Sequence, residues 1–535
     1  MSDIPVLASE RAGAVAKQQS VHGRAGHVLE RAVWASRAYA RFDADSVARV
    51  VRAVAAAAAE KAEEYAEWAV RETGFGVVEH KVMKNLACST GLLDRYAGHD
   101  FVSHRVDESM KIVEVPRPAG VVLALTPSTN PVASVYFKAL LALMTRNAVV
   151  ISPHPMAKEV CSAAARHLAE AAVAAGAPDG VVQWLPEPSI PLIEAVMQDE
   201  RTDLIVATGG TGVVRAAYSS SNPALGVGPA NVPVLVDRTA DVRRAAQEIV
   251  DSKAFDNSVL CTNESVLVVE DTVADSLLAE MQRQGAHLLT QEEAGRLAAH
   301  MFPMGTLNTE VIGKDATVIA EAAGIRTGPR TRVLLAPMSA ALPEEPMARE
   351  KLSPVLGVLR VPDATAGIAA ARALLRNSGA GHSAAIHSED ADTVMAYSSA
   401  VPVLRVAVNV GNSTGSSGLS TNLAPSMTIG TGFLGRSSIG ENLEPRHLLN
   451  WSRIAYHSDP SVAMPDFARQ DPTVRPTTAI PRYPSASNDS TAPAPTPPAA
   501  GRGGPSGALD ASQEAQLREQ IRRLVTEELS HLMKG

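Results

Sequence analysis

Cys261 has the surroundings of a reactive thiol. It lies in FDNSVLCTNES, between a helical run that ends near Lys253 and a strand that begins near Ser265. Its polar neighbours are typical of a turn, so we expect the thiol on a loop at a strand edge, within reach of a substrate. A thiolate there could form a covalent intermediate. The alternative is a small buried apolar side chain, which is our interpretation of Cys88 and Cys161 because both lie in helical patterns.

Asn130 comes at the end of an apolar strand, directly before Pro131, in LTPSTNPVAS. This order is typical of a helix N-cap followed by proline at the first helical position. An amide fixed at a helix start is also a preorganised donor that could stabilise the oxyanion of a tetrahedral intermediate. The two interpretations are compatible, and the pattern does not choose between them.

Glycines fill the turn TGGTG at residues 208–212, which joins a strand to the helical run VVRAAYSS. Without side chains, Gly209 and Gly210 would let backbone N–H groups approach a pyrophosphate at the positive end of that helix. The spacing is not GxGxxG, so an ordinary strand-to-helix turn is the alternative.

The sequence patterns around these candidate residues predict an α/β protein. Residues 27–100 carry apolar positions at helical spacing and predict a helical layer. Short apolar runs then alternate with helical ones, first through VVLAL, AVVI, VVQWL and DLIVA, and again over about residues 231–410. Strands separated by helices of this length indicate right-handed crossovers and parallel sheets covered on both faces.

The composition excludes several classes of protein. A chain of 535 residues, 46% of them apolar, can bury large cores in two or three lobes. Its 49 basic and 57 acidic residues give a net charge of -8 without a basic run, so we expect no nucleic-acid partner. No apolar run reaches about 18 residues and no secretory signal opens the sequence, so we expect a cytoplasmic protein that does not enter a membrane. The three cysteines show no CxxC spacing, which predicts neither a disulfide framework nor a metal site.

Prolines crowd the chain after about residue 457, so we predict a disordered, proline-rich linker over 458–508. Residues 509–535 then predict an amphipathic helix with an apolar stripe of Leu517, Ile521, Leu524, Val525, Leu529 and Leu532. An isolated helix of this length is marginal in water, so the stripe needs a partner surface. Its polar face lacks the basic surplus of a membrane-surface helix.

Several segments together resemble one enzyme family. FDNSVLCTNES, LTPSTNPVASVYFKALLALMTRNAVVISPHP, ATGGTGVVRAAYSSSNPALGVG and EKLSPVLG are similar to motifs of the aldehyde dehydrogenase superfamily. The resemblance covers about residues 30–457. It points to the coenzyme A-acylating branch, which includes the aldehyde half of bifunctional alcohol/aldehyde dehydrogenases and the propionaldehyde and acetaldehyde dehydrogenases of bacterial microcompartments.

The resemblance implies the aldehyde dehydrogenase fold. A Rossmann-like NAD-binding domain would span residues 1–230, with an oligomerisation strand near 110–118. An α/β catalytic domain would span 231–425. A return segment at 426–457 would join that strand in a small β flap, and the chain would form a homodimer or homotetramer.

The resemblance also implies roles in catalysis. Cys261 occupies the nucleophile position, and the acyl-enzyme thioester that it forms would pass its acyl group to coenzyme A. Asn130 occupies the oxyanion-hole position, together with the backbone N–H of Cys261. His382, in GAGHSAAIH, is a candidate proton shuttle for the incoming thiol, with a structural histidine as the alternative.

For the cofactor, the resemblance implies NAD. Gly209 and Gly210 would face the pyrophosphate, and Glu350 of EKLSPV aligns with the glutamate that holds the nicotinamide ribose. The segment near the adenine ribose reads ISPHP here, where hydrolytic relatives carry a lysine, and it contributes Ser152, His154 and Pro155.

One departure from the hydrolytic pattern indicates the reaction. Hydrolytic members carry a glutamate in an ELGG-like segment that activates water, and the matching stretch here has Gly226 at that position, in LGVGP. The thioester should therefore persist until a thiol arrives, which predicts acyl-CoA as the product from a short-chain aldehyde. The alternatives are a hydrolytic dehydrogenase that releases the free acid, or a non-catalytic scaffold associated with a shell.

The predicted C-terminal helix on its linker is similar in layout to encapsulation peptides, which dock enzymes into bacterial microcompartments. This similarity implies that microcompartment shell proteins are partners and that the protein lies in the microcompartment lumen. The alternative is a helix that adds contacts within the enzyme's own oligomer.

Overall fold

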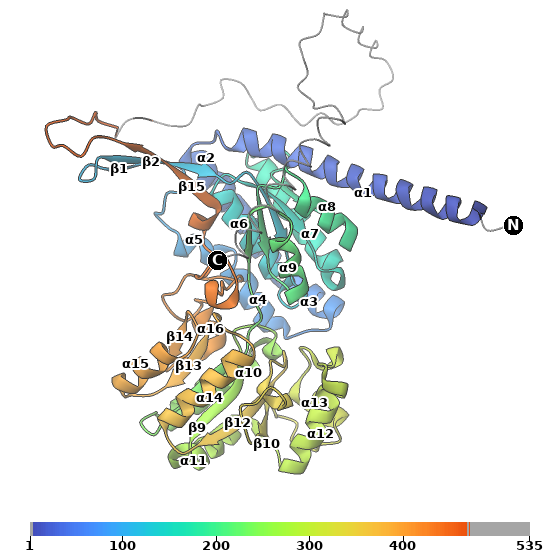
Figure 1. Cartoon of the computed structure of the whole chain (residues 1–535), viewed down its shortest axis with the longest axis vertical. Helices are drawn as coiled ribbons and strands as arrows, with labels where there is room; N and C mark the ends of the chain where they lie inside the picture. The colour runs from blue at the N-terminus through green and yellow to red at the C-terminus, as the bar shows by residue number, and fades with distance from the viewer. Residues whose placement is uncertain (1–3, 468–469, 471–535) are drawn as a thin grey trace, which may run out of the picture. The chain divides into compact units, whose positions relative to one another are not determined.

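The structure, a computed structural model, describes residues 4–467 and residue 470, with side chains from Ser20 onward. Five helices open the chain (Figure 1): α1 (Ile4–Tyr39), α2 (Ala44–Glu60), α3 (Ala62–Thr73), α4 (Val78–Ala87) and α5 (Thr90–Arg95). Asp43 caps α2 by accepting a hydrogen bond from Ser46 N at 2.8 Å. These helices confirm the helical layer that the sequence predicts over residues 27–100.

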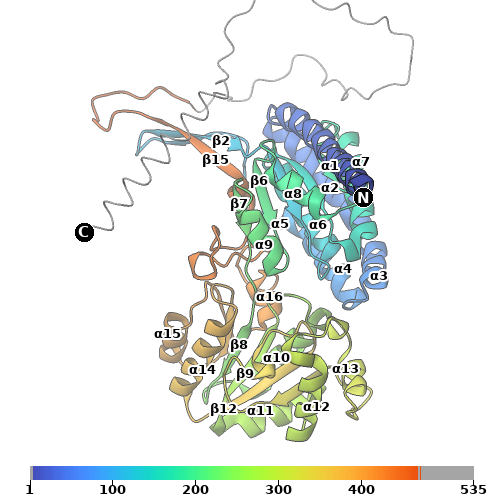
Figure 2. The same ribbon diagram turned by 45° about the vertical axis from the view of Figure 1, so that its right-hand side comes forward.

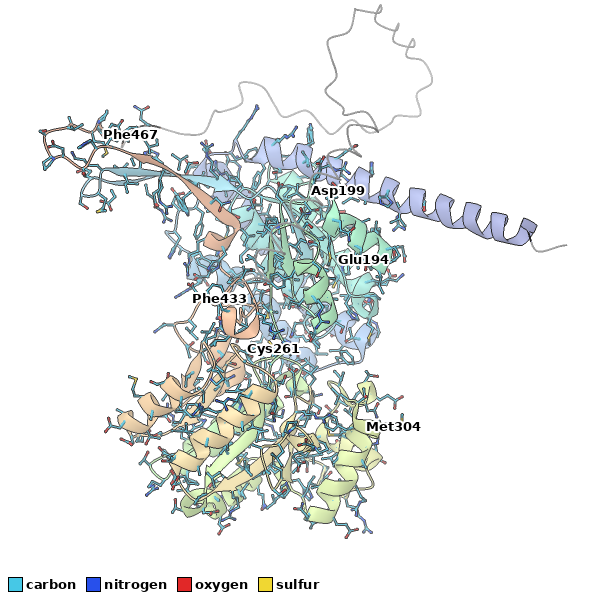
Figure 3. The ribbon with its side chains drawn as sticks, viewed as in Figure 1. Glu194, Asp199, Cys261, Met304, Phe433 and Phe467 are labelled. Atoms are coloured by element: carbon cyan, nitrogen blue, oxygen red, sulfur yellow. The ribbon has the colours of Figure 1, made fainter. Side chains whose placement is uncertain are left out.

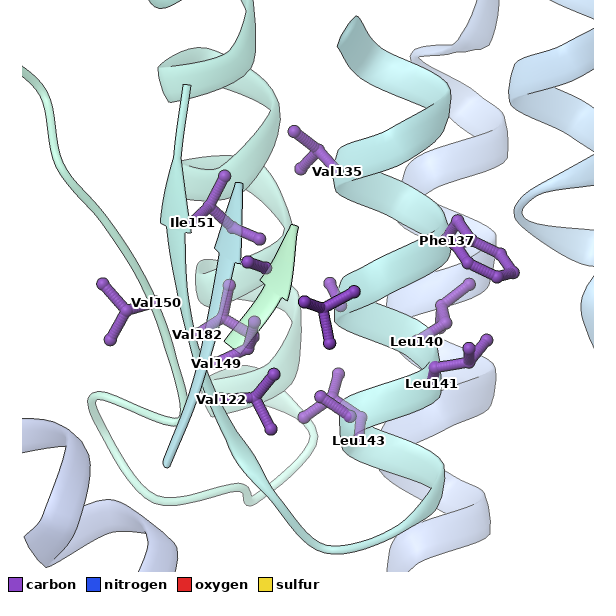
Figure 4. Packing of buried hydrophobic residues seen from close by; sticks show 14 of the residues in the cluster. Val122, Val135, Phe137, Leu140, Leu141, Leu143, Val149, Val150, Ile151 and Val182 are labelled. Carbon is purple, nitrogen blue, oxygen red and sulfur yellow. The ribbon is translucent and has the colours of Figure 1, made fainter. Parts of the chain in front are cut away.

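The first sheet is parallel and has the strand order β5-β4-β3-β6-β7. Its strands are β3 (Val121–Leu125), β4 (Ala148–Ser152), β5 (Val182–Trp184), β6 (Leu204–Ala207) and β7 (Ala224–Gly226). The helices of this part of the chain are α6 (Pro131–Met144), α7 (Lys158–Ala174), α8 (Ile190–Gln198) and α9 (Thr211–Tyr218). All residues of α6 are buried, and its Val135 and Leu143 belong to the same apolar cluster as Val122 and Val149 of the sheet (Figure 4).

The second sheet is also parallel, with the order β10-β11-β12-β9-β8-β13-β14. Its strands are β8 (Val232–Val236), β9 (Glu264–Glu270), β10 (Ala286–Leu288), β11 (Val333–Pro337), β12 (Val355–Val361), β13 (Ala384–His387) and β14 (Val406–Val408). Its helices are α10 (Val242–Ala254), α11 (Asp271–Arg283), α12 (Gln291–Met301), α13 (Ala316–Ala322), α14 (Ala364–Asn377), α15 (Ala391–Ala400) and α16 (Asn412–Ser416). Figure 2 shows β6 and β7 of the first sheet together with β8, β9 and β12 of the second.

A small antiparallel sheet joins two distant segments. It has the order β1-β2-β15, from β1 (Arg105–Asp107), β2 (Ile112–Pro118) and β15 (Leu449–Ala455), and Leu449 pairs with Pro118. The return segment therefore pairs with the strand near residues 110–118, and the role of this flap in oligomerisation stays a prediction.

Two segments differ from the sequence expectations. In the apolar run VPVLRVAV at residues 401–408, only Val406–Val408 forms a strand, and the Arg405 side chain before it donates to His382 O at 2.7 Å. The predicted linker begins along the flap, where Lys111 Nζ donates to Val462 O at 2.7 Å and His104 bonds to Phe467 O at 2.7 Å. The rest of the linker and the predicted C-terminal helix lie outside the described residues.

No helix within the described residues is both long and apolar enough to cross a membrane. The break between the two parallel sheets falls between Gly226 and Val232, near residue 230, where the sequence predicts the end of a cofactor-binding domain. The functional assignment of the domains stays a prediction.

Candidate active site

The segment that leads to Cys261 adopts an unusual backbone conformation. It begins with the 3-10 helix η2 (Phe255–Ser258), in which φ is 49° at Asp256, 50° at Asn257 and 64° at Ser258. Non-glycine residues seldom adopt this left-handed conformation, which costs on the order of 1 kcal/mol or more per residue. Contacts with the rest of the protein must therefore hold the loop in this shape.

Buried side chains provide these contacts. The Lys253 ammonium donates to Ser258 Oγ at 2.8 Å, and Asn257 Nδ2 donates to Asp315 Oδ1 at 2.8 Å. The Asp256 carboxylate accepts from Val77 N at 2.7 Å, so the loop is also attached to the start of α4. The three strained residues are thus each held by a different neighbouring segment.

The Cys261 thiol is partly exposed, whereas Cys88 and Cys161 are buried. Enclosure of the sulfur by protein atoms, and then the nearby Glu350 carboxyl, raise the pKa of Cys261 to about 12, while the Arg405 guanidinium acts in the opposite direction. The resting thiol is therefore protonated at neutral pH. Nucleophilic attack by its sulfur requires a group that accepts the proton.

Glu350 is the carboxyl whose charge reaches the thiol. Burial raises its pKa to about 7, and the positive charges of Lys253 and Lys351 keep that pKa from rising further. A carboxyl with such a pKa exchanges protons near neutral pH, as a general base must. The sequence assigns Glu350 to cofactor binding by resemblance alone and does not reveal this coupling to Cys261.

His382 is buried and neutral. Burial first, and then the positive charge of Arg405, lower its pKa to about 3. Its Nδ1 bonds to Ser383 Oγ at 2.9 Å, and within the described part of the chain its Nε2 has no hydrogen-bond partner. The imidazole can therefore exchange a hydrogen bond at Nε2, but it cannot store a positive charge at low cost.

The three candidate groups of the catalytic lobe lie at one edge of the second sheet. Cys261 precedes β9, Glu350 precedes β12, and His382 precedes β13. Since β12, β9, β8 and β13 are consecutive parallel strands, their amino ends meet at the same edge. Figure 3 shows Cys261 between the two large sheets.

The candidate cofactor residues lie at the carboxyl edge of the first sheet. Ser152 ends β4, Asn130 follows β3, and Gly209 and Gly210 follow β6. Because β3 lies between β4 and β6 and all three are parallel, these residues share one edge. Crevices at the carboxyl edge of such sheets are common ligand sites.

This edge fits a dinucleotide. Gly210 is the N-cap of α9, and a Cβ atom added there would meet nothing within 4 Å, so the helix start is open to a phosphate. Ser152 Oγ is buried and has no hydrogen-bond partner among the described residues. His154, whose pKa is lowered by burial, accepts a hydrogen bond from Met156 N, and Pro155 beside it is exposed.

Asn130 is the N-cap residue of α6 by position, but its side chain does not cap the helix. Its Oδ1 atom accepts a hydrogen bond from the Lys84 ammonium at 2.5 Å, and its Nδ2 atom donates to Thr129 Oγ1 at 3.2 Å. The structure thus confirms Asn130 as the N-cap residue followed by proline at the first helical position, although its amide oxygen bonds to the Lys84 ammonium and not to a backbone N–H of the helix.

A buried charge cluster connects Asn130 with the loop of Cys261. Lys81 and Lys84 of α4 both pair with the Asp256 carboxylate, and all three side chains are at most 4% exposed. Sequence analysis did not identify these lysines. Their spacing of three residues puts them on one helix face, but only the fold shows that this face is buried against Asp256.

Gly226 lies where a side chain has no room. A Cβ atom there would lie 2.8 Å from Tyr218 Cε2 and 2.8 Å from Val214 Cγ1. The tyrosine ring cannot easily retreat, because its hydroxyl donates to Gly226 O at 3.2 Å and accepts from Gly226 N at 2.9 Å. The position that the sequence resemblance aligns with the water-activating glutamate of hydrolytic members is thus closed by Tyr218 and Val214.

Among the residues that the structure describes, no group of three or more His, Cys, Asp or Glu side chains could hold a metal ion.

The chain matches the aldehyde dehydrogenase family over residues 8–421 and belongs to it. The bifunctional aldehyde-alcohol dehydrogenase AdhE of Escherichia coli is 36% identical over 438 residues, which cover 81% of this chain and 49% of that protein. The chain thus spans about half the length of this curated relative.

Solved structures match over nearly their whole length. An acetylating aldehyde dehydrogenase from Geobacillus thermoglucosidasius is 37% identical, with a TM-score of 0.81, over 84% of this chain and 99% of that chain. A propionaldehyde dehydrogenase from the fucose utilisation microcompartment of Clostridium phytofermentans is 27% identical, with a TM-score of 0.75, over 82% and 98%. A propionaldehyde dehydrogenase from Rhodopseudomonas palustris, solved with bound propionyl-CoA, is 26% identical, with a TM-score of 0.74, over 81% and 94%. These matches confirm the aldehyde dehydrogenase fold that the sequence motifs predict.

The raised pKa of Cys261 predicts slow alkylation at neutral pH. Because burial and Glu350 raise this pKa to about 12, the thiolate fraction, and with it the rate of labelling by iodoacetamide, should rise about tenfold per pH unit from pH 7 to 10. Peptide mass spectrometry measures the labelling site by site, with Cys88 and Cys161 as buried internal controls. A labelling rate that levels off near pH 7 would show a preformed thiolate and contradict the protonated resting state.

The crowding at Gly226 predicts that Gly226→Glu does not convert the site to hydrolysis. The new side chain must displace Tyr218 and Val214, at a cost of about 1–3 kcal/mol of folding free energy, and its carboxylate is not held by the contacts of a native base. Chemical denaturation and assay of the free acid measure the two effects. Gly295→Glu is the matched control, because a Cβ at Gly295 meets nothing within 4 Å. Free acid formed by Gly226→Glu at unchanged stability would refute this reading of the site.

Proposed function

We propose that this protein oxidises a short-chain aldehyde to the corresponding acyl-CoA, with NAD as the hydride acceptor and coenzyme A as the acyl acceptor. The observation that carries this proposal is the closure of position 226 by Tyr218 and Val214. An acyl-enzyme without a water-activating carboxylate at that position lasts long enough to meet a thiol. The acetylating relative and the relative with bound propionyl-CoA support the same reaction type.

In the first step, the Cys261 sulfur attacks the aldehyde carbon. The proton of the thiol passes to Glu350, whose pKa of about 7 suits it to accept a proton at neutral pH. The aldehyde oxygen becomes an oxyanion, which Asn130 Nδ2 and the backbone N–H of Cys261 stabilise. One such donor contributes about a hundredfold to a thousandfold to the rate.

NAD, when bound, supplies the acceptor for the hydride that the aldehyde carbon loses. The residues proposed to hold it lie at the carboxyl edge of the first sheet, with Gly209 and Gly210 at the pyrophosphate and Ser152, His154 and Pro155 at the adenine ribose. Glu350, once ionised, accepts hydrogen bonds from the nicotinamide ribose. The segment ISPHP lacks a lysine, and a neutral His154 offers no charge to a 2′-phosphate, which favours NAD over NADP.

In the last step, the coenzyme A thiol attacks the acyl-enzyme thioester and releases Cys261. His382 assists by exchanging a hydrogen bond with the thiol at its unpaired Nε2 atom. Because the pKa of His382 is lowered to about 3, the imidazole does not keep the proton of the coenzyme A thiol, and the proton passes to the leaving sulfur of Cys261 and restores its thiol. The product is a thioester, so the energy of aldehyde oxidation is kept in a C–S bond.

We propose further that the protein works in the lumen of a bacterial microcompartment as a homodimer or homotetramer. The proline-rich segment and the apolar stripe of residues 509–535 support docking to shell proteins. The solved relative from the fucose utilisation microcompartment of Clostridium phytofermentans supports the setting. Confinement would retain a volatile aldehyde near the enzyme.

The proposed reaction predicts that NADH formation requires coenzyme A after the first turnover. With acetaldehyde or propionaldehyde and no thiol, the purified protein should release at most one NADH per active site, because the acyl group stays on Cys261. Absorbance at 340 nm measures this burst, and mass spectrometry measures acylated Cys261. Cys261→Ala should abolish both signals with NAD binding preserved. Sustained NADH release without a thiol would establish the hydrolytic alternative, and inactivity of the wild type toward a panel of short aldehydes would favour a scaffold.

The proposed docking predicts the effect of removing residues 509–535. The shortened protein should keep its turnover in solution, because the described active site lies before residue 443, but it should no longer co-sediment with purified microcompartment shells. A variant with Leu517, Ile521 and Leu524 changed to serine serves as the matched control at full length. Unchanged co-sedimentation of both proteins would contradict docking through this stripe.

A further inference from the structure

Lys84 contacts both Asn130 and the loop that leads to Cys261. Its ammonium donates to Asn130 Oδ1 at 2.5 Å and also to the Asp256 carboxylate. Asn130 lies at the carboxyl edge of the first sheet, and Asp256 lies in the loop that leads to Cys261. One side chain, only 1% exposed, thus bridges the proposed oxyanion donor and the loop of the nucleophile.

The chemistry of lysine fixes the orientation of the Asn130 amide. An ammonium group has three donors and no acceptor, so it can bond only to the amide oxygen. The Nδ2 end of the same amide must therefore point away from Lys84, where one N–H bond donates to Thr129 Oγ1 and the other is available. Without Lys84, the amide could rotate by 180° and present its oxygen to the oxyanion, which would repel it.

Charge strengthens this effect. Lys81 and Lys84 together with Asp256 carry a net positive charge, since two ammonium groups face one carboxylate. An ammonium on the amide oxygen draws electron density from Nδ2 and makes its N–H bonds better donors. The buried surroundings keep this interaction strong because little water screens it.

The cluster is not a ligand site of its own. The cavity lined by Lys81, Lys84, Asn85 and Asn130 has a volume of about 10 Å³, which is room for about one water molecule. Lys81 is already bonded to Thr129 O at 3.1 Å and to Asp256 at 3.1 Å. The ammonium groups of Lys81 and Lys84 are therefore already bonded to groups of the protein itself.

We propose that Lys84 is a positioning residue for catalysis: it holds the Asn130 amide with Nδ2 toward the oxyanion and, through Asp256, ties that amide to the loop of Cys261. This inference rests on the proposed role of Asn130 as the oxyanion donor. It adds Lys84, a residue of α4 that lies outside the sequence motifs, to the residues that support catalysis by Cys261.

A double-mutant cycle tests the proposal in the full-length protein, with Lys84→Met, Asn130→Ala and the combined variant. Lys84→Met leaves Lys81 paired with Asp256 as a neutral pair, so the fold should persist, and thermal unfolding checks this. We expect Lys84→Met to lower kcat about tenfold or more with little change in the KM for NAD. In the combined variant, kcat should be no lower than in Asn130→Ala alone, because Lys84 acts through the amide.

Two further variants separate positioning from simple structural support. Lys81→Met removes one of the two ammonium groups that pair with Asp256, as Lys84→Met does, but it keeps the contact between Lys84 and Asn130. The kcat of Lys81→Met should therefore fall much less than that of Lys84→Met. Lys84→Arg, which keeps a donor-only cation, should recover part of the lost kcat. Additive losses in the cycle, or equal losses for Lys81→Met and Lys84→Met, would overturn the inference while leaving the proposed function intact. If Asn130→Ala itself left kcat unchanged, the assigned oxyanion donor would be wrong, and the inference would fail with it.

Discussion

The active site depends on the Asp256 carboxylate, which is fully buried between two ammonium groups. Burial alone would raise its pKa, but Lys84 and Lys81 outweigh burial, so the pKa of Asp256 is lowered and the residue stays ionised at neutral pH. A group with a lowered pKa stabilises the folded protein at neutral pH, and this contribution is lost as the pH falls into the acid range. Removing one partner of such a buried cluster typically costs about 3–5 kcal/mol when it leaves a charge unpaired. The cluster therefore has to form whenever the protein is folded.

This constraint explains how a strained loop can carry the nucleophile. Asp256, Asn257 and Ser258 all have positive φ angles, and each forms a hydrogen bond with a different segment. The strain fixes the direction in which the chain enters Cys261. The Asp256 carboxylate also binds α4, which packs against α6 beside the first sheet. It therefore fixes the position of the Cys261 thiol, at the amino edge of the second sheet, relative to the Asn130 amide, at the carboxyl edge of the first. A site assembled from two sheets needs such a shared anchor.

The sequence predicts those features that local pattern determines. The apolar runs that form β3, β4, β9 and β12 are recognisable because both faces of these strands are buried. The loop position of Cys261 follows from the turn residues around it. Lys84 could not be predicted, because its contact with Asp256 joins residues 172 positions apart, and its partner Asn130 looked like a helix cap. The buried contacts of Arg405 depend on carbonyl groups that only the fold brings together.

The active site also shows that the presence or absence of a carboxylate does not alone determine whether water or a thiol would attack an acyl-enzyme. The sequence pointed to a site that lacks one, because Gly226 replaces the glutamate of hydrolytic relatives. The structure nevertheless has Glu350 close enough to alter the pKa of Cys261, with a pKa of its own near that of a good base. In the proposed reaction, the position of the carboxylate is therefore what protects the thioester. Glu350 precedes β12 on the side of the thiol, whereas the position from which a glutamate would direct water is filled by the ring of Tyr218. A base that can take a proton from a sulfur need not be able to orient a water molecule against the acyl carbon, since orientation contributes as much to such a step as basicity does.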